Sequence, residues 1–233
     1  MDAQHLSKRL AQVAEFVPQG ARMADIGSDH AYLPAALVLA GKIPMAVAGE
    51  VAAGPYQNME NEIRANGLTG QIIPRLANGL AAIKPADHID TVVIAGMGGT
   101  LIADILDQGQ DQLAGVKRLI LQPNVGEFRL RAWLLAHRYQ IMAERLVKED
   151  DHIYEIIVAE PSLVPFSYSD YELMFGPLLL EKKGPVFTEK WQDYLHRQAG
   201  VLDQISGAKQ PPCDKIKQLQ GRMRLVKEAL NDD

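Results

Sequence analysis

Acidic and amide side chains in this chain gather in short segments that each follow an apolar run. The first segment, Asp25–His30, places Gly27 where a tight turn would let the backbone approach a ligand closely. A dinucleotide-binding fingerprint would need glycines at positions 27, 29 and 32, but Asp29 and Tyr32 occupy the last two. Because a carboxylate repels a pyrophosphate, Asp29 disfavours a pyrophosphate ligand at this turn.

The carboxylates of the same segment suit a cationic ligand. S-adenosylmethionine carries an ammonium and a sulfonium group, and we expect Asp25 and Asp29 to face its methionine end. The other members of the turn that we expect to line the donor site are Gly27, Ser28 and His30. The alternatives are that Asp29 only caps the following helix and that His30 is a structural histidine.

Two later segments carry candidate contacts to a nucleoside. Glu50 ends a second apolar run, where an acid accepts both ribose hydroxyls in proteins that bind either NAD or S-adenosylmethionine. Asn78 and Gly79 follow the third run. Asn78 offers a carbonyl to an adenine amino group, or the pair forms only an Asn-Gly turn.

A glycine-rich segment follows the fourth apolar run. Residues 95–99 read Ala-Gly-Met-Gly-Gly, which indicates a backbone that approaches a ligand closely or a strained turn. We therefore add Ala95, Gly96 and Met97 to the expected donor site.

Two amides follow the fifth apolar run. Gln122 and Asn124 flank Pro123, and amides at such a strand end would bracket the polar edge of a nucleobase. We expect Gln122, Asn124 and His30 to be the catalytic residues. The sequence contains no metal-ligand cluster of usual spacing, no P-loop and no nucleophile elbow at Ser28. Methyl transfer needs none of these, because its catalyst aligns and desolvates the two reactants.

The elements that must position these segments alternate along the first 160 residues. Apolar runs predict strands over residues 22–26, 45–50, 72–75, 91–95, 118–121, 140–147 and 153–159. Helical spacing predicts helices over residues 6–17, 35–40, 56–66, 101–106 and 128–137. Such alternation favours a parallel sheet, whereas the short turn Lys148–Asp151 makes the last pair antiparallel. The expected fold is α/β, a Rossmann-like sheet of the class I methyltransferase type, mostly parallel with one antiparallel strand.

A second domain is expected after residue 160, where prolines interrupt the pattern. Apolar residues then recur at alternating spacings of three and four in two stretches, which predicts a coiled-coil-like hairpin of two antiparallel helices. The residues of these two seams are Trp191, Leu195, Leu202 and Ile205, and then Ile216, Leu219, Met223, Val226 and Leu230. We expect a catalytic domain over residues 1–160 and a helical hairpin domain over residues 161–233.

Composition limits the remaining function classes. The hydrophobic content of 47% supports a sizeable core, and the net charge of −5 gives no global sign of nucleic-acid binding. Residues 161–233 hold ten basic and ten acidic residues, so that part is close to neutral. One cysteine, no signal-peptide core and no apolar run of membrane-spanning length lead us to expect a soluble, cytoplasmic protein without a membrane partner.

The combined segments resemble the TrmK family, bacterial tRNA (adenine-22-N1)-methyltransferases. The resemblance rests on Ala24–Pro34, Ala95–Gly99, Leu121–Asn124, and Glu149-Asp150 with Tyr154-Glu155. It implies S-adenosylmethionine as donor and a tRNA adenine as acceptor, while Asn78 stands where the family leads us to expect an acid. Candidate RNA contacts are the basic residues Arg9, Arg129, Arg131, Lys182, Lys183 and Arg197. The alternatives are a non-catalytic RNA-binding scaffold that keeps a donor pocket and a nicotinamide-dependent oxidoreductase.

Overall fold

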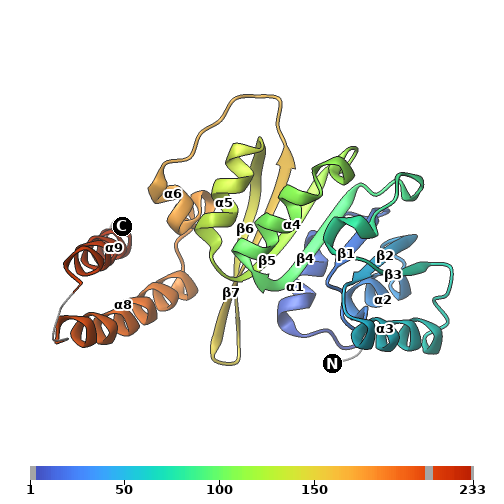
Figure 1. Cartoon of the computed structure of the whole chain (residues 1–233), viewed down its shortest axis with the longest axis horizontal. Helices are drawn as coiled ribbons and strands as arrows, with labels where there is room; N and C mark the ends of the chain where they lie inside the picture. The colour runs from blue at the N-terminus through green and yellow to red at the C-terminus, as the bar shows by residue number, and fades with distance from the viewer. Residues whose placement is uncertain (1–3, 208–211, 232–233) are drawn as a thin grey trace. The chain divides into compact units, whose positions relative to one another are not determined.

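The computed structural model describes residues 4–207 and 212–231. Seven strands form one sheet in the order β3-β2-β1-β4-β5-β7-β6 (Figure 1). Strand β7 runs antiparallel to both β5 and β6, and the other neighbouring pairs are parallel. The strands are β1 Arg22–Ile26, β2 Met45–Glu50, β3 Ile72–Leu76, β4 Thr91–Gly98, β5 Arg118–Val125, β6 Tyr139–Glu149 and β7 His152–Pro161.

Helices cover both faces of this sheet (Figure 1). One face packs against α1 Lys8–Phe16, α2 Tyr32–Leu39 and α3 Ala53–Ala65, whose buried side chains share a core with Met23, Val93 and Ile120 of the sheet. The other face is covered by α4 Gly99–Gln108 and α5 Glu127–Ala136, which contact one another. Three short 3-10 turns complete this part: η1 Gly79–Ala82, η2 Pro85–Asp87 and η3 Gln110–Leu113.

The expected strands and helices of the first 160 residues are all present, and the Rossmann-like class with one antiparallel strand is confirmed. Strands β4 and β5 extend further than expected, to Gly98 and Val125. The segments expected to close these strands continue to pair, because bulges on either side of Met97 let its backbone stay in register with Pro123. The expectation that Gln122–Asn124 ends the fifth strand is therefore wrong.

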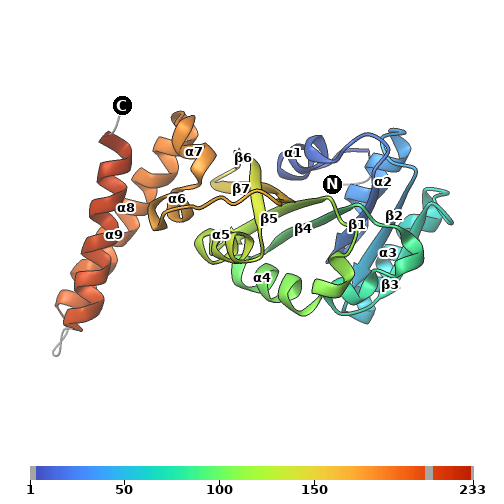
Figure 2. The same ribbon diagram turned by 90° about the horizontal axis from the view of Figure 1, so that it is seen from above.

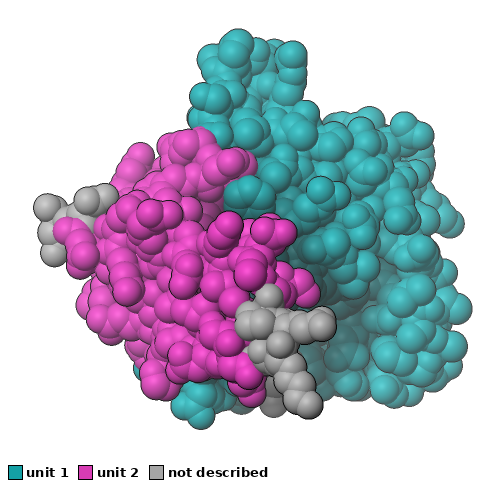
Figure 3. Space-filling model, turned by 60° about the vertical axis from the view of Figure 1, so that its left-hand side comes forward, with its two compact units in different colours: residues 1–168 teal, residues 169–233 magenta. Residues whose placement is uncertain are grey.

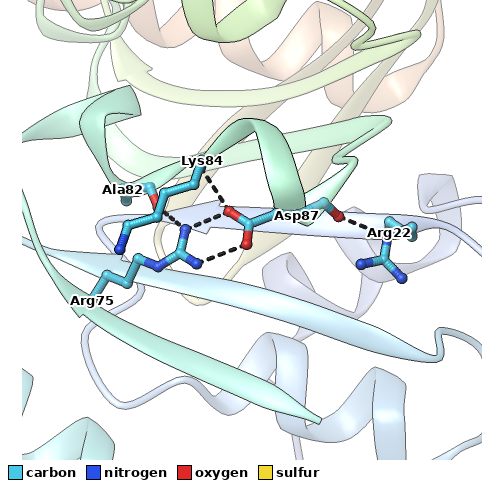
Figure 4. Close-up of polar contacts among 5 residues, drawn as sticks. All are labelled: Arg22, Arg75, Ala82, Lys84 and Asp87. Atoms are coloured by element: carbon cyan, nitrogen blue, oxygen red, sulfur yellow. Dashed lines mark hydrogen bonds and ion pairs between the residues drawn. The ribbon is translucent and has the colours of Figure 1, made fainter. Parts of the chain in front are cut away.

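A salt bridge fixes the long connection between β3 and β4 (Figure 4). Arg75 on β3 donates from both terminal nitrogens to the carboxylate of Asp87, at the end of η2. Lys84 N–H also donates to this carboxylate, and the Asp87 carbonyl accepts from Arg22 Nε on β1. The guanidinium of Arg75 holds the pKa of Asp87 below its usual value. This network fixes Lys84 and Asp87 in the second half of the connection. Asn78 and Gly79 lie in the first half of the same connection.

The chain divides into two compact units, Met1–Tyr168 and Ser169–Asp233 (Figure 3). The sequence places the boundary after residue 160, whereas the segment up to Tyr168 remains with the first unit. There the Tyr168 hydroxyl accepts a hydrogen bond from Ile141 N–H of β6. No helix among residues 4–207 and 212–231 is long and apolar enough to cross a membrane.

The second unit contains four helices within its described residues. Two short ones, α6 Asp170–Phe175 and α7 Pro177–Glu181, were not predicted, because each is too short to show a helical period. The long helices α8 Pro185–Ser206 and α9 Cys213–Asn231 pack side by side and antiparallel (Figure 2). Every residue of the two predicted seams is buried or half-buried, so the predicted helical hairpin is present.

Candidate functional site

The turn after β1 places Asp25 at the carboxyl edge of the sheet. Its carboxylate is 6% exposed and accepts a hydrogen bond of 2.5 Å from the Ser28 hydroxyl. Burial raises the pKa of Asp25 to about 6, and the Ser28 hydrogen bond opposes that shift. A buried carboxylate that lacks a cationic partner within the described chain is suited to a cationic group from a ligand.

Gly27 brings this turn against the end of β4. Its φ is +74°, and a Cβ at this position would stand 2.0 Å from Met97 Cε. The backbone N–H groups of Gly27 and Ser28 both donate to the Gly49 carbonyl of β2, which holds the turn down on the sheet. Two of the expected donor segments, the turn after β1 and the glycine-rich end of β4, are therefore in contact through Gly27 and Met97.

The rest of the first segment has a left-handed backbone. Asp29 and Ala31 have φ values of +51° and +56°, and Ala31 is the N-cap of α2 without a side-chain hydrogen bond. The alternative that Asp29 caps this helix is therefore wrong. The Asp29 side chain is 68% exposed and lies 3.8 Å from His30 Nε2. The His30 ring stacks on Tyr32 with ring centroids 5.1 Å apart.

Glu50 and Asn78 lie where β2 and β3 end. Glu50 Oε1 accepts from the backbone N–H groups of Val51 and Ala52, so this buried carboxylate is held in one orientation. Asn78 is exposed, and its carbonyl accepts from Ala81 N–H at the start of η1. The Asn-Gly turn is thus present, and it leaves the Asn78 side chain at the surface.

The amides of Gln122 and Asn124 join the ends of β4 and β5 in one network. Gln122 is fully buried, and its Oε1 accepts from Gly96 N–H at 3.0 Å. Its Nε2 donates to the Pro123 carbonyl and to Asn124 Oδ1. Asn124 is exposed and donates from Nδ2 to the Gly96 carbonyl at 2.8 Å. Asn124 therefore presents its amide to solvent, while Gln122 lies beneath it.

Arg9 of α1 contacts the same network. Its Nη1 donates to Gln122 Oε1, and its guanidinium carbon lies 5.4 Å from the centre of the Tyr154 ring on β7. The sequence predicted Arg9 as a contact to RNA phosphate and gave Tyr154 no role. The alternation of side chains along a strand could predict which face of the sheet Tyr154 lies on. It could not predict the contact with Arg9, which is 145 residues away in sequence.

Arg131 does not contact RNA, and this prediction is wrong. Its side chain is fully buried and pairs with Glu144 of β6 and Glu155 of β7, which are equally buried. Burial disfavours the charge, but the two carboxylates outweigh it and raise the pKa of Arg131. Arg131 joins α5 to the hairpin of β6 and β7.

The remaining basic candidates are accessible to different extents. Arg129, Lys182 and Arg197 are exposed, and Lys183 is half-buried. Arg129 lies on α5, whereas the other three belong to the second unit.

A hollow of about 380 Å³ lies at the opposite edge of the sheet. Its walls include Gly20, Asp90, Lys117 and Arg118, at the amino ends of β1, β4 and β5. Ligands of open α/β sheets bind beyond the carboxyl ends of the strands, so the candidate site is the edge that carries Asp25, Met97 and Asn124.

Comparisons with known proteins show which proteins this chain is similar to. Residues 23–228 match the family model TrmK, described as tRNA (adenine(22)-N(1))-methyltransferase. A Bacillus subtilis protein with the same description is 42% identical over 237 residues, which cover 99% of each chain.

Solved structures extend the similarity. A putative tRNA (m1A22) methyltransferase of Streptococcus pneumoniae in complex with S-adenosyl-L-methionine is 44% identical, with a TM-score of 0.88 over 97% of this chain and 100% of that one. TrmK of M. capricolum in complex with S-adenosyl-homocysteine is 30% identical, with a TM-score of 0.86 over 97% and 98% of the two chains.

Proposed function

Since this chain belongs to the TrmK family of tRNA (adenine(22)-N(1))-methyltransferases, we propose that it transfers a methyl group from S-adenosylmethionine to N1 of adenine 22 in tRNA. Its close relatives include structures bound to S-adenosyl-L-methionine and to S-adenosyl-homocysteine. This membership supports the methyltransferase function over the oxidoreductase and the non-catalytic scaffold. We propose that it acts in the cytoplasm, because its tRNA substrate is found there.

The observation that carries the proposal is the contact between the Asp25–His30 turn and the end of β4. Met97 lies against Gly27 on one side, and its neighbour Gly96 is bound to both Gln122 and Asn124 on the other. This contact supports a site in which a methyl donor held by the first turn lies next to amides that can hold the acceptor.

The donor site uses buried acids without pyrophosphate-binding glycines. Asp25 offers a carboxylate to the cationic methionine end, and Glu50 offers one to the ribose hydroxyls. Ser28 is bonded to Asp25 and Gly27 lies against Met97, so we propose these residues, with Ala95 and Gly96, as further contacts to the donor. Asp29, His30, Asn78 and Gly79 complete the rim that we propose for the donor.

S-adenosylmethionine supplies an electrophilic methyl group on its sulfonium. The adenine N1 lone pair forms the new bond as the carbon–sulfur bond breaks, and the positive charge moves from sulfur to the base. No protein base is required, because neutral N1 carries no proton. Asn124 contacts the polar edge of the base, Gln122 holds Asn124 from below, and His30 with Tyr32 offers an aromatic wall.

Contacts to the tRNA backbone are proposed for basic residues on both units, of which all but the half-buried Lys183 are exposed. Arg129 lies in the first turn of α5, shortly after the catalytic amides in sequence. Lys182, Lys183 and Arg197 belong to the helical unit. We propose that unit 1 carries the methyl transfer and that the helical hairpin binds tRNA. Exposed arginines and lysines of this kind give affinity through phosphate neutralisation.

Methyl transfer from labelled S-adenosylmethionine to in-vitro transcribed tRNA tests the proposal. The wild-type chain should incorporate label, and Asn124→Ala should lower kcat by about 100-fold while calorimetric donor affinity stays unchanged. Arg64→Ala, on the exposed surface of α3, is the matched control and should leave both quantities unchanged. Tight donor binding by the wild type with no label in any tRNA would refute the proposal.

A further inference from the structure

Arg9 contacts the amide network from an element that lies far away in sequence. Arg9 lies on α1, and its Nη1 donates a hydrogen bond to Gln122 Oε1, at the base of the network. The Arg9 guanidinium lies over the Tyr154 ring, and a Cβ on Gly96 would be 3.6 Å from Arg9 Nη1. Arg9 is half-buried among these groups and precedes the segment that matches the family model.

The bond from Arg9 fixes which end of the Gln122 amide faces which partner. Gln122 Oε1 lies between two donors, the guanidinium of Arg9 and the N–H of Gly96. A cationic donor makes a stronger hydrogen bond than a neutral one, so the guanidinium favours this orientation over the flipped one. The Nε2 group of Gln122 then has to face Asn124 Oδ1.

The orientation of Gln122 in turn sets that of Asn124. Because Asn124 Oδ1 accepts from Gln122, its Nδ2 donates to the Gly96 carbonyl. One N–H of Nδ2 and one lone pair of Oδ1 remain for the acceptor base. A flip of either amide would exchange the donor and acceptor that Asn124 offers.

Helix α1 does not depend on Arg9 for its attachment. Lys8 donates from its backbone and side chain to Glu149 and Lys148 of β6. Arg145 of β6 donates to Gln12 and Glu15 of α1, and its guanidinium carbon lies 4.6 Å from the centre of the Phe16 ring. Loss of the Arg9 side chain therefore leaves α1 in place.

We propose that Arg9 is a positioning residue for methyl transfer, which acts through Gln122 to fix the amide of Asn124, and not a contact to tRNA phosphate. This assignment rests on the proposed function, since Asn124 is placed there against the acceptor base. The proposal makes kcat, not affinity, the quantity that Arg9 controls.

Steady-state methylation of tRNA by Arg9→Ala and Arg9→Lys tests this assignment. Arg9→Ala should lower kcat by about 10- to 100-fold, with donor affinity and the KM for tRNA within about twofold of wild type. Arg9→Lys keeps a cationic donor and should recover part of kcat. Arg145→Ala removes a different contact to α1 and should keep wild-type kcat.

Salt dependence separates this role from a phosphate contact. A lost phosphate contact would raise the KM for tRNA and reduce the slope of log affinity against log salt by about one. That result, with kcat unchanged, would overturn the proposal. The expected result is an unchanged slope.

A double-mutant cycle tests whether Arg9 acts through Gln122. In a Gln122→Ala background, Arg9→Ala should cause no further loss of kcat, since its target is gone. Losses that multiply would overturn the proposal.

A measurement that does not depend on activity separates a failure of the Arg9 proposal from a failure of the proposed function. In ¹H–¹⁵N spectra, Arg9→Ala should shift the side-chain NH₂ signals of Gln122 and Asn124, and Arg145→Ala should not. Unshifted Asn124 signals would overturn the role of Arg9 even in a protein that methylates no RNA. An inactive wild type would instead refute only the proposed function.

Discussion

Replacement of Arg131 by methionine should destabilise the chain strongly. The substitution removes a guanidinium that donates to Glu144 at 2.7 Å and to Glu155, with all three side chains at most 1% exposed. It leaves two buried carboxylates without a cation. Removal of one partner from a buried ion pair costs about 3–5 kcal/mol of unfolding free energy, and the two facing carboxylates place Arg131→Met toward the upper end.

The matched control is Arg118→Met. Arg118 pairs with Glu160, but their side chains are 31% and 32% exposed, so water replaces much of the lost interaction. A pair of this exposure is worth about 0–1 kcal/mol. Urea unfolding followed by far-ultraviolet circular dichroism, with linear extrapolation, measures both changes.

The loss of unfolding free energy in Arg131→Met should depend on pH. Without the guanidinium, burial raises the pKa of the remaining carboxyls of Glu144 and Glu155 above their unfolded values. A group shifted in this direction contributes stability at low pH that is lost as the pH rises through its folded pKa. The deficit should therefore shrink on going from pH 7.5 to pH 5, by at most about 1.4 kcal/mol per pH unit for each carboxyl. A deficit below about 1 kcal/mol, equal to that of Arg118→Met, would refute the account of this cluster.

Three further predictions concern the donor turn and the β3–β4 connection. Burial raises the pKa of Asp25 to about 6, so its carboxylate is lost as the pH falls; calorimetry should show donor affinity about tenfold weaker at pH 5 than at pH 7, and Asp25→Asn should bind weakly with no such dependence. Gly27→Ala forces a side chain into a left-handed backbone at φ +74° against Met97, and should lose about 1–2 kcal/mol of stability together with donor binding; Met97→Ala should restore part of the binding, and no restoration would contradict the contact. Arg75 lowers the pKa of Asp87, so the stability from this pair is present above the ordinary aspartate pKa and is lost as the pH falls below it; Asp87→Asn should flatten acid unfolding between pH 5 and pH 3, and an unchanged profile would count against the salt bridge.

Local pattern was sufficient for the strands and for the order of the loops. The runs that form β1 and β2 are mostly apolar and stop at glycine or acid, so their predicted ends agree with the structure. The parallel arrangement then follows from alternation with helices, and it brings the ends of β1, β2, β4 and β5 to one edge.

Burial of polar side chains could not be predicted in the same way. Gln122 and Arg131 are polar residues that sequence favours at the surface, yet both are fully buried. Their partners are distant in sequence: Gln122 is bonded to Arg9 and Gly96, and Arg131 to residues of the closing hairpin. A one-dimensional pattern carries no signal for such pairs, so a contact to RNA and a structural ion pair look alike from the sequence.

The position of the modified nucleotide is the most direct test of methyl transfer to adenine 22. A tRNA transcript is incubated with the wild-type chain and S-adenosylmethionine, and reverse transcription maps the methylated base, since an N1-methyl blocks the pairing edge. We expect a donor-dependent stop at adenine 22, which is strongly reduced with Asn124→Ala and absent with a transcript that carries guanine at that position. A stop at another nucleotide, or none in a protein that binds the donor, would contradict this expectation.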